Sequence, residues 1–325
     1  MKNIKVAIIG ATGLVGKTLI KIFSEKNLVF DRLYLYATEK SAGKIINYRD
    51  KEIIIKSFNL SSFPICDYIF ICAGNDFSKE YALKLTNYGT VIDNSSIYRL
   101  SKNVPLIIPE INGNKITCKD SLIANPNCTT AILAIPIKII SKEYEIKEIT
   151  ITSLQAVSGS GIQGIESLQN KNNNNFYSYD ITKNCIPKIG NCKKCSSSEE
   201  EQKIQDEMNK ILDNYDAQIN ATCIRVPIIN THSISVKLQL NKKVDIDKIY
   251  KLLNECDQLI IIDDPSNDKY PVASIANEKN EITIGRIRLG SDENTLLFYL
   301  TGDNLRRGAA YNAYKIMEYH LNVSS

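Results

Sequence analysis

The sequence predicts an α/β protein in which a doubly wound parallel sheet comes first and an α+β domain follows. Three observations lead to this prediction. The chain opens on a short apolar strand, 4–9, which runs directly into a glycine-rich loop and a helix. Apolar strands then alternate with helical segments as far as residue 110. Within 148–155, apolar and polar residues alternate over several positions, which is typical of a strand with one exposed face.

Composition and charge narrow the class of protein. With 325 residues, the chain is long enough for about two domains. The net charge of +4 is small, and the basic residues are spread out, so we expect neither nucleic acid nor a membrane surface as a partner. No apolar run approaches the length of a membrane span, and no export signal precedes the first strand. The nine scattered cysteines therefore indicate reduced thiols and a cytoplasmic protein.

The first loop has the pattern G-x-x-G-x-x-G over residues 10–16. It lies between the strand at 4–9 and a helix expected over 14–24, the context in which such a loop binds a dinucleotide. Glycines let the backbone approach a pyrophosphate, which the helix N-terminus attracts. A glycine turn with a purely steric role is the alternative. The cofactor-binding residues predicted here are Gly10, Thr12, Gly13, Leu14 and Val15.

The end of the second strand, 33–36, bears on the choice of cofactor. An NAD site usually carries an acidic residue at this point, to bind the ribose hydroxyls. Here the strand runs into Thr38, Lys40 and Ser41, and a cation with hydroxyls suits the 2′-phosphate of NADP. Glu39 weakens the pattern, and a solvated turn is the alternative. We predict NADP.

Three further segments extend the predicted sheet. Strands are expected at 68–74, 90–96 and 105–110, with a helix over 78–87. Arg99 comes just after a strand end, at the edge where doubly wound sheets bind ligands. A lone arginine at such a place is more often a surface charge, so both interpretations stay open.

A single cysteine, Cys128, lies between an apolar strand at 121–124 and a helix at 129–135. Backbone N–H groups and the dipole of a helix start favour a thiolate, which is the nucleophilic form of cysteine. Most cysteines outside disulfides are small buried core residues, and that is the alternative. The hexapeptide at 125–130 is therefore a candidate for covalent catalysis.

The second half supplies a possible base. Strands are expected at 148–155, 221–227 and 233–238, with a flexible polar turn over 156–161. The chain has two histidines, and His320 falls in the terminal helix expected at 303–321, where a structural role is more common. His232 is thus the candidate imidazole base for the thiol, although loop histidines are often plain polar surface.

The remaining segments have less bearing on function. Helices are expected near 199–213 and 244–256, strands at 259–262, 281–286 and 295–300, and an asparagine-rich surface loop at 170–175. A loop carries Cys185, Cys192 and Cys195. The C-x-x-C pair would suit zinc, but a second pair or nearby histidines are missing, so no metal site is predicted.

Taken together, these motifs resemble aspartate-semialdehyde dehydrogenase of the bacterial type, and the similarity runs nearly end to end. The cysteine hexapeptide and the downstream arginine–histidine pair are its most specific part. The matching segments are 10–16, 40–43, 93–96 with Arg99, 125–130, 155–159, 225–227 with His232, 285–288 and 303–306.

The resemblance implies NADPH-dependent reduction of L-aspartyl 4-phosphate to L-aspartate 4-semialdehyde and phosphate. It implies a Rossmann-like NADP-binding domain at 1–127, completed by a terminal helix within 303–325, and a catalytic and dimerisation domain at 128–302. A homodimer is expected, with a tetramer as the alternative.

The resemblance also implies residue roles. Cys128 would form a thioester, His232 would take the thiol proton or assist loss of hydride, and Gln155 would orient the substrate. The expected substrate-binding residues are Arg225 for the α-carboxylate, Glu200 for the ammonium, and Arg99, Asn127 and Lys203 for phosphate. Ser158, Gly159 and Asn304 join the cofactor-binding set.

The sequence departs from the family pattern in three places. Lys40 stands where many relatives carry arginine, which weakens the preference for NADP. Asn75 and Asp76 replace the small residues expected near the cofactor phosphate. The loop after Cys185 has no recognised counterpart.

Three alternatives remain. N-acetyl-γ-glutamyl-phosphate reductase shares the chemistry but places its cysteine in a different local sequence. Glyceraldehyde-phosphate dehydrogenase also has a cysteine followed by two threonines, yet the residues before it differ. A non-catalytic NADP-binding thiol sensor would not need the carboxylate clamp at Arg225.

Overall fold

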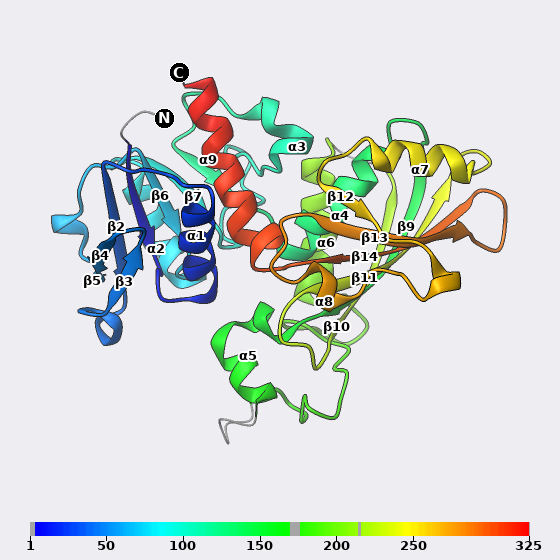
Figure 1. The fold of residues 1–325 in the computed structure, drawn as a ribbon, viewed down its shortest axis with the longest axis horizontal. Helices are drawn as coiled ribbons and strands as arrows, with labels where there is room; N and C mark the ends of the chain where they lie inside the picture. Colours follow the sequence, from blue (N-terminus) through cyan, green and yellow to red (C-terminus); the bar gives the residue numbers. More distant parts are fainter. Residues whose placement is uncertain (1–3, 170–175, 214–215, 325) are drawn as a thin grey trace. The chain divides into compact units, whose positions relative to one another are not determined.

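The computed structural model describes residues 4–169, 176–213 and 216–324. The chain divides into two compact units, one formed by Met1–Pro126 with Ala309–Ser325 and the other by Asn127–Gly308. Figure 1 follows the first unit in blue to teal, with its terminal helix in red. The asparagine-rich loop expected at 170–175 lies outside the described residues. Within the described part, no helix has the length and apolarity needed to cross a membrane.

The first unit is built on a sheet in the order β5-β2-β1-β6-β7-β8, in which every neighbouring pair is parallel. The chain order reverses beside β1, because β2 pairs with one side of it and β6 with the other. The predicted doubly wound sheet is therefore confirmed, and ligands of such sheets bind beyond the carboxyl ends of the strands at this reversal. The strands are β1 (Lys5–Ile9), β2 (Arg32–Ala37), β5 (Lys56–Ser57), β6 (Tyr68–Ile71), β7 (Thr90–Asp93) and β8 (Leu122–Ala124).

One expected strand of this unit is wrong. Residues 105–110 form no strand in the described structure and make an isolated parallel bridge between Leu106 and Ala124. Pro105 and Pro109 lack the N–H groups that a sheet ladder needs, which explains why pairing does not extend. Pro109 instead begins a short helix.

The terminal helix completes the core of the first unit. Helix α9 packs against α1 (Figure 1). The ring of Phe23 on α1 lies edge-on to Phe30, Phe70 and Tyr314, with centroids 5.1, 5.6 and 6.3 Å apart. The predicted return of the C-terminal helix is confirmed. The other elements here are α1 (Leu14–Glu25), β3 (Ile45–Tyr48), β4 (Lys51–Ile54), α2 (Asn75–Leu85), α3 (Pro109–Asn112) and α9 (Tyr311–Val323).

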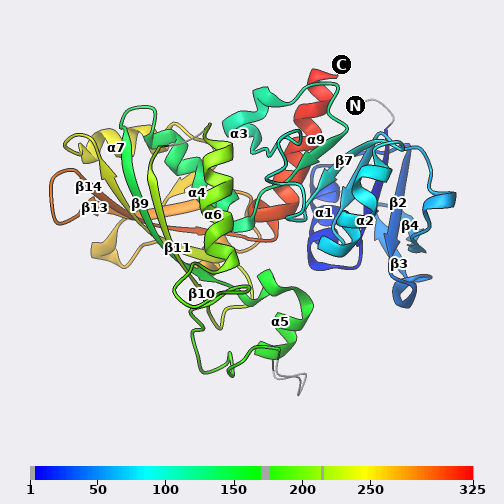
Figure 2. The same cartoon turned by 180° about the vertical axis from the view of Figure 1, so that it is seen from behind.

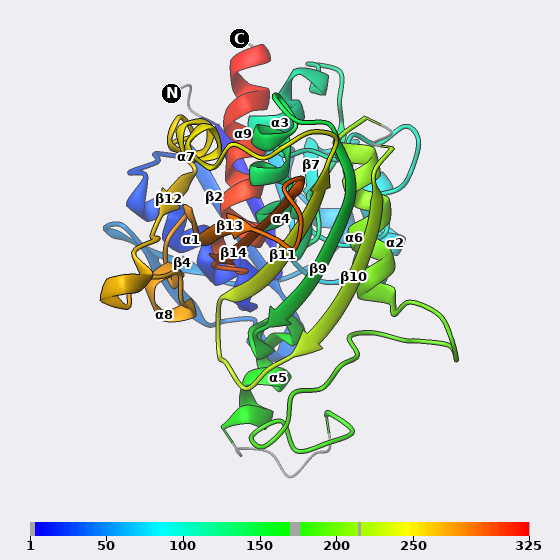
Figure 3. The ribbon, with the colours of Figure 1, turned by 90° about the vertical axis from the view of Figure 1, so that its right-hand side faces the viewer.

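The second unit holds a mixed sheet in the order β10-β9-β11-β14-β13-β12 (Figure 3). Its two outer pairs are parallel and the three inner pairs are antiparallel, which confirms the predicted α+β character. Along β9, buried residues alternate with half-buried ones from Ile149 to Gln155. The strands are β9 (Ile146–Gln155), β10 (Gln218–Arg225), β11 (His232–Leu240), β12 (Leu259–Ile261), β13 (Ile282–Leu289) and β14 (Thr295–Gly302).

Helix α4 (Cys128–Ile140) is the centre of this unit's core. It contacts β14, α6 (Glu199–Ile211) and α7 (Ile246–Asn254), and α6 in turn packs on β10 (Figures 2 and 3). Almost every α4 side chain is buried, and the helix continues through Pro136, five residues beyond its predicted end. The remaining helices are α5 (Gly161–Leu168) and α8 (Ala273–Ala276).

His320 of α9 is a buried part of the first core. Its Nδ1 lies 2.8 Å from Tyr68 Oη, and its side chain is 4% exposed. Burial lowers the pKa of His320 below the ordinary histidine value, although Asp120 acts in the opposite direction. The folded protein therefore holds this imidazole neutral at neutral pH.

We predict that the buried, neutral His320 makes the free energy of unfolding decrease as the pH is lowered. The unfolded chain binds the His320 proton more readily, so the stabilisation is complete above about pH 6.5 and is lost as the pH falls below that value. Urea unfolding of the parent and His320→Gln at pH 5.5 and 7.5 checks this. The variant should show a smaller difference between the two pH values. Some difference should remain, because the pKa of His232 is also lowered. An unchanged difference would contradict the prediction.

Candidate active site

Cys128 is the first residue of α4, and Asn127 caps that helix. The Asn127 side-chain oxygen accepts hydrogen bonds from the N–H groups of Thr129, at 2.8 Å, and Thr130, at 3.3 Å. A thiol at this position lies at the positive end of the helix dipole, which favours the thiolate. The structure thus fixes the start of the helix at the residue that the sequence singled out.

His232 meets the thiol at close range. It is the first residue of β11, is fully buried, and brings Nε2 to 3.3 Å from Cys128 Sγ. Its other ring nitrogen, Nδ1, accepts a hydrogen bond from the Ala156 N–H at 3.1 Å. A nitrogen that accepts carries no proton, so this hydrogen bond assigns the proton of the neutral ring to Nε2. The imidazole therefore presents an N–H donor to the sulfur.

Charge and burial keep this ring neutral. Desolvation, aided by the positive charge of Arg225, holds the pKa of His232 well below its usual value. A base that takes the thiol proton would need the opposite tautomer, whose Nδ1–H would point at the Ala156 N–H. The geometry therefore favours His232 as a hydrogen-bond donor to a thiolate.

Glu200 gathers two other predicted residues around it. Its Oε1 accepts hydrogen bonds from Asn127 Nδ2 at 2.9 Å and from Gln155 Nε2 at 3.2 Å. Gln155 Nε2 also lies 2.9 Å from Thr129 Oγ1, so it contacts the first turn of α4. Glu200 is 7% exposed and lies in the first turn of α6, where a helix N-terminus stabilises a negative charge. Lys203 follows one turn later on the same helix.

Arg225 is buried at the end of β10, directly opposite Gln155 in the parallel register. Its Nη1 donates to the Ala156 carbonyl at 2.6 Å. Gly159 explains how the guanidinium fits: a Cβ at this position would lie 2.9 Å from Arg225 Nη1 and 3.4 Å from the His232 ring. A side chain at 159 would therefore displace both groups.

The turn at 156–161, expected to be flexible, is an ordered 3₁₀ turn with buried Val157 and Ser158. Their N–H groups donate to the carbonyls of Ile228 and Ile229, at 2.8 and 3.0 Å, so the turn is held to the segment before β11. The sequence gives no sign of this partner segment.

Asn304 has a positioning role that the sequence analysis missed. Its Nδ2 donates to Ser158 Oγ at 2.9 Å, and its Oδ1 accepts from the Thr231 N–H at 2.9 Å. Thr231 has φ +80°, a strained conformation for a β-branched residue, immediately before His232. Asn304 therefore helps to hold the backbone that aims the imidazole.

Glu207, which is 1% exposed on α6, was not singled out from the sequence. Its carboxylate accepts a hydrogen bond from the Asn127 N–H at 2.6 Å. It lies on the apolar stripe of α6, with Ile204, Met208 and Ile211. An acid on such a stripe is the feature by which the sequence could have indicated it.

In the first unit, the glycine loop has the geometry of a phosphate cradle. Gly10 has φ +87°, and a Cβ there would lie 2.4 Å from the Cys72 carbonyl oxygen. A Cβ on Gly16 would lie 2.3 Å from the Gly10 oxygen, so both positions require glycine. The N-cap Gly13 offers no side-chain cap to α1, whose first N–H groups can therefore receive an anion. These features fit a dinucleotide, as predicted for the loop from Gly10 to Val15.

The residues predicted for the 2′-phosphate follow β2. Thr38 caps a short 3₁₀ turn, Glu39–Ser41, in which Lys40 is exposed. Asp76 lies in the first turn of α2, whose N-cap Gly74 has φ +89°. The acid at 76 therefore adds negative charge to the helix start.

Arg99 is also in the first unit and is not a surface charge. It is 8% exposed, its Nε donates to the Asn125 carbonyl, and its Nη2 donates to the Asn94 carbonyl, both at 2.8 Å. It is therefore fixed against two loop carbonyls near the ends of β7 and β8.

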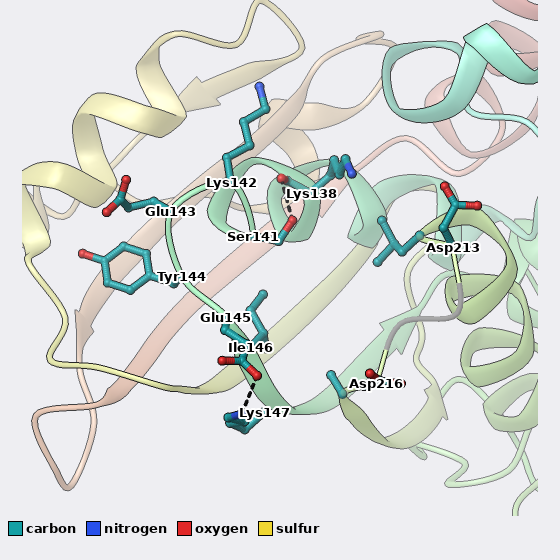
Figure 4. Close-up of a pocket in the computed structure, with 12 residues that line it drawn as sticks. Lys138, Ser141, Lys142, Glu143, Tyr144, Glu145, Ile146, Lys147, Asp213 and Asp216 are labelled. Carbon is teal, nitrogen blue, oxygen red and sulfur yellow. Dashed lines mark hydrogen bonds and ion pairs between the residues drawn. The ribbon is translucent and has the colours of Figure 1, made fainter.

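A surface cavity of about 520 Å³ lies elsewhere in the second unit, at the C-terminal end of α4 (Figure 4). The 13 residues of α4 separate it from Cys128 by about 20 Å. It is distinct from the candidate site. Its charged lining residues are Lys138, Lys142, Glu143, Glu145, Lys147, Asp213 and Asp216.

The cysteine-bearing loop forms no recognised centre. Cys185, Cys192 and Cys195 are exposed, and no disulfide is present among the described residues. No group of three potential metal ligands is found in the described part of the chain.

Two family models match the chain. Residues 5–118 match "Semialdehyde dehydrogenase, NAD binding domain", and residues 137–307 match "Semialdehyde dehydrogenase, dimerisation domain". Together they span most of both units.

Relatives and solved structures agree with the family models. Aspartate-semialdehyde dehydrogenase of Aquifex aeolicus is 36% identical, over 97% of each chain, and that of Rickettsia conorii is 35% identical, over 99% of this chain and 98% of the relative. The crystal structure of Vibrio cholerae aspartate semialdehyde dehydrogenase II complexed with ASA has a TM-score of 0.93 at 29% identity, over 99% of both chains. This chain therefore belongs to the aspartate-semialdehyde dehydrogenase family of oxidoreductases.

Proposed function

We propose that this enzyme reduces L-aspartyl 4-phosphate to L-aspartate 4-semialdehyde with NADPH, through a thioester on Cys128. The observation that carries the proposal is the His232 Nε2 atom 3.3 Å from Cys128 Sγ at the start of α4. Family membership supports the substrate class. The reaction belongs to the biosynthesis of lysine, threonine, methionine and diaminopimelate.

The first step is acyl transfer to sulfur. The Cys128 thiolate attacks the acyl-phosphate carbonyl, and the bond from carbon to the phosphate oxygen breaks with its electron pair leaving on phosphate. Before attack, the Nε2–H of His232 and the helix dipole stabilise the thiolate. The product is a thioester on Cys128, and the released phosphate takes up one proton from the solvent.

The second step releases the aldehyde. The thioester carbonyl on Cys128 would accept a hydride, which is the chemistry that a nicotinamide cofactor would supply here, and would become a tetrahedral oxyanion. The oxyanion restores the C=O bond and expels Sγ as a thiolate, which again accepts the Nε2 hydrogen bond. His232 gives up no proton in either step, in agreement with its lowered pKa.

The α-carboxylate and the ammonium of the substrate each have a proposed partner of opposite charge. The Arg225 guanidinium can bind the α-carboxylate through two parallel N–H bonds, and Glu200 can accept from the ammonium. Gln155 orients the substrate beside the thiol. Arg99, Asn127 and Lys203 form the proposed phosphate-binding set.

The proposed cofactor is NADP, with a pyrophosphate site at Gly10, Thr12, Gly13, Leu14 and Val15. Thr38, Lys40 and Ser41 bind the 2′-phosphate, because a cation and two hydroxyls follow the end of β2. Ser158, Gly159 and Asn304 are the other proposed cofactor-binding residues. The crystal structure of Candida albicans aspartate semialdehyde dehydrogenase with NADP has a TM-score of 0.77 at 22% identity and supports the fold alone.

We also propose a cytoplasmic homodimer. The dimerisation-domain match over residues 137–307 supports self-association. The catalytic and dimerisation domain is assigned to 128–302, and the NADP-binding domain to 1–127 with 303–325.

The direct assay runs the reaction in reverse. Aspartate semialdehyde and phosphate should generate NADPH from NADP, and omission of phosphate should stop turnover because the thioester has no other efficient acceptor. If N-acetyl-glutamate semialdehyde is oxidised and aspartate semialdehyde is not, the proposed substrate is wrong.

Cys128→Ala should lose turnover by about 10⁴-fold or more, because the covalent path is removed. Cofactor binding, followed by fluorescence of NADPH, should remain within about twofold, since the glycine loop is untouched. Cys185→Ala, at an exposed thiol, is the matched control and should behave like the parent. Substantial turnover by Cys128→Ala would rule out the thioester.

His232→Asn should lower kcat by about 10²–10⁴-fold with little change in KM, because the donor to sulfur is lost. Steady-state kinetics at pH 8 measures this, with His320→Asn as the matched histidine control. A kcat within a few-fold of the parent would contradict the role given to His232.

Lys40→Ala should raise KM for NADP by about tenfold and leave KM for NAD almost unchanged, because one charged contact to the 2′-phosphate disappears. Initial rates with both cofactors measure the two constants. Equal changes for NADP and NAD would show that Lys40 does not read the 2′-phosphate.

A further inference from the structure

Glu207 belongs to no motif of the sequence and has no part in the proposed chemistry. It is nevertheless a carboxylate 1% exposed, on the buried face of α6, two helical turns after Glu200. Burial of an acid is unfavourable unless strong hydrogen bonds compensate it. One such bond is the 2.6 Å contact with the backbone N–H of Asn127.

We propose that Glu207 is a positioning residue, which holds the cap of α4 and thereby sets the reactivity of Cys128. The inference rests on the proposed function, in which Cys128 is the nucleophile. Glu207 reaches the reacting sulfur through Asn127 and touches neither substrate nor cofactor.

The Asn127 N–H needs an acceptor from outside its own helix. As the N-cap residue, Asn127 precedes the helical hydrogen-bond pattern, so no carbonyl of α4 can accept from it. Asn127 is only 7% exposed, so water cannot readily serve as the acceptor. The preceding residue, Pro126, has no N–H, so it does not compete for the acceptor that Asn127 uses. A carboxylate makes the stronger, charge-assisted kind of hydrogen bond.

Three hydrogen-bonding groups of Asn127 are held from different directions. Its Oδ1 caps α4, its Nδ2 donates to Glu200, and its N–H donates to Glu207. Glu200 and Glu207 are seven residues apart and therefore lie on one face of α6. This face holds both the side chain and the backbone of the residue next to the nucleophile.

Gly308 limits movement of Cys128 on another side. A Cβ on Gly308 would lie 2.7 Å from Cys128 Cβ and 3.0 Å from its Cα. The backbone of Cys128 therefore packs closely against residue 308. With Glu207 holding Asn127, the first turn of α4 has little freedom to shift, and the thiol keeps its place at the helix start.

The test measures thiol reactivity without any substrate. Iodoacetamide alkylation of Cys128 is followed by mass spectrometry from pH 6 to pH 9, with exposed Cys185 as internal reference. Glu207→Ala should slow Cys128 alkylation at pH 7 about fivefold to tenfold and move its pH profile upward, because a loosened cap stabilises the thiolate less. Glu207→Gln keeps an acceptor and should stay within about twofold of the parent.

Controls separate positioning from a general effect on folding. Asp206→Ala, at a half-buried acid next in sequence that accepts from Gln202, should match the parent. If Glu207→Ala does not fold, Glu207→Asp serves instead, because its shorter side chain stretches the bond to Asn127 and should also slow alkylation. In the reverse reaction, the slowed variants should show a raised KM for phosphate, the proposed ligand of Asn127.

Two results would overturn the proposal. One is a Glu207→Ala or Glu207→Asp protein whose melting temperature falls while Cys128 alkylation keeps its rate and pH profile. The other is a Glu207→Gln protein as slow as Glu207→Ala, since the acceptor would then not matter. Neither depends on aspartate semialdehyde, so failure of the proposed substrate would leave this test intact.

Discussion

Hydrogen bonds on both ring nitrogens fix His232 in one protonation state. The Ala156 N–H occupies Nδ1, which leaves the ring proton on Nε2, 3.3 Å from Cys128 Sγ. Burial and the nearby Arg225 charge favour the same neutral form. The site therefore stabilises an anionic sulfur with a neutral donor and a helix terminus, and it needs no proton relay in the proposed acyl transfer and aldehyde release.

The surrounding elements position the contact between His232 Nε2 and Cys128 Sγ. The ends of β9 and β10 are paired in register, which brings Gln155 and Arg225 to the same edge of the sheet. Asn304 accepts a hydrogen bond from the Thr231 N–H and so helps to hold the strained backbone just before His232. Helix α6 supplies two acceptors to Asn127: Glu200 accepts from its side-chain amide, and Glu207 accepts from its backbone N–H. The site is thus assembled from sheet ends, one helix start and one supporting helix.

Motifs with strong local rules were predictable from the sequence. The strand–glycine loop–helix segment and the cysteine at a helix start each depend on neighbours within ten residues, and both elements form where expected. Expectations that depended on distant partners were weaker. The turn at 156–161 looked flexible because its partners, Ile228 and Ile229, lie about seventy residues away. The segment at 105–110 looked like a strand because apolar content outweighed its two prolines. Glu207 escaped notice because its partner, the Asn127 N–H, carries no side-chain pattern.

The thioester is the central claim, and a phosphate-free reaction tests it most directly. Aspartate semialdehyde and NADP are mixed with the enzyme, and the Cys128 peptide is examined by mass spectrometry. We expect a burst of about one NADPH per active site and an aspartyl group on Cys128 that phosphate removes, since hydride loss precedes the phosphate step. NADPH formation on addition of phosphate, with no burst before it and no acyl group on Cys128, would contradict it.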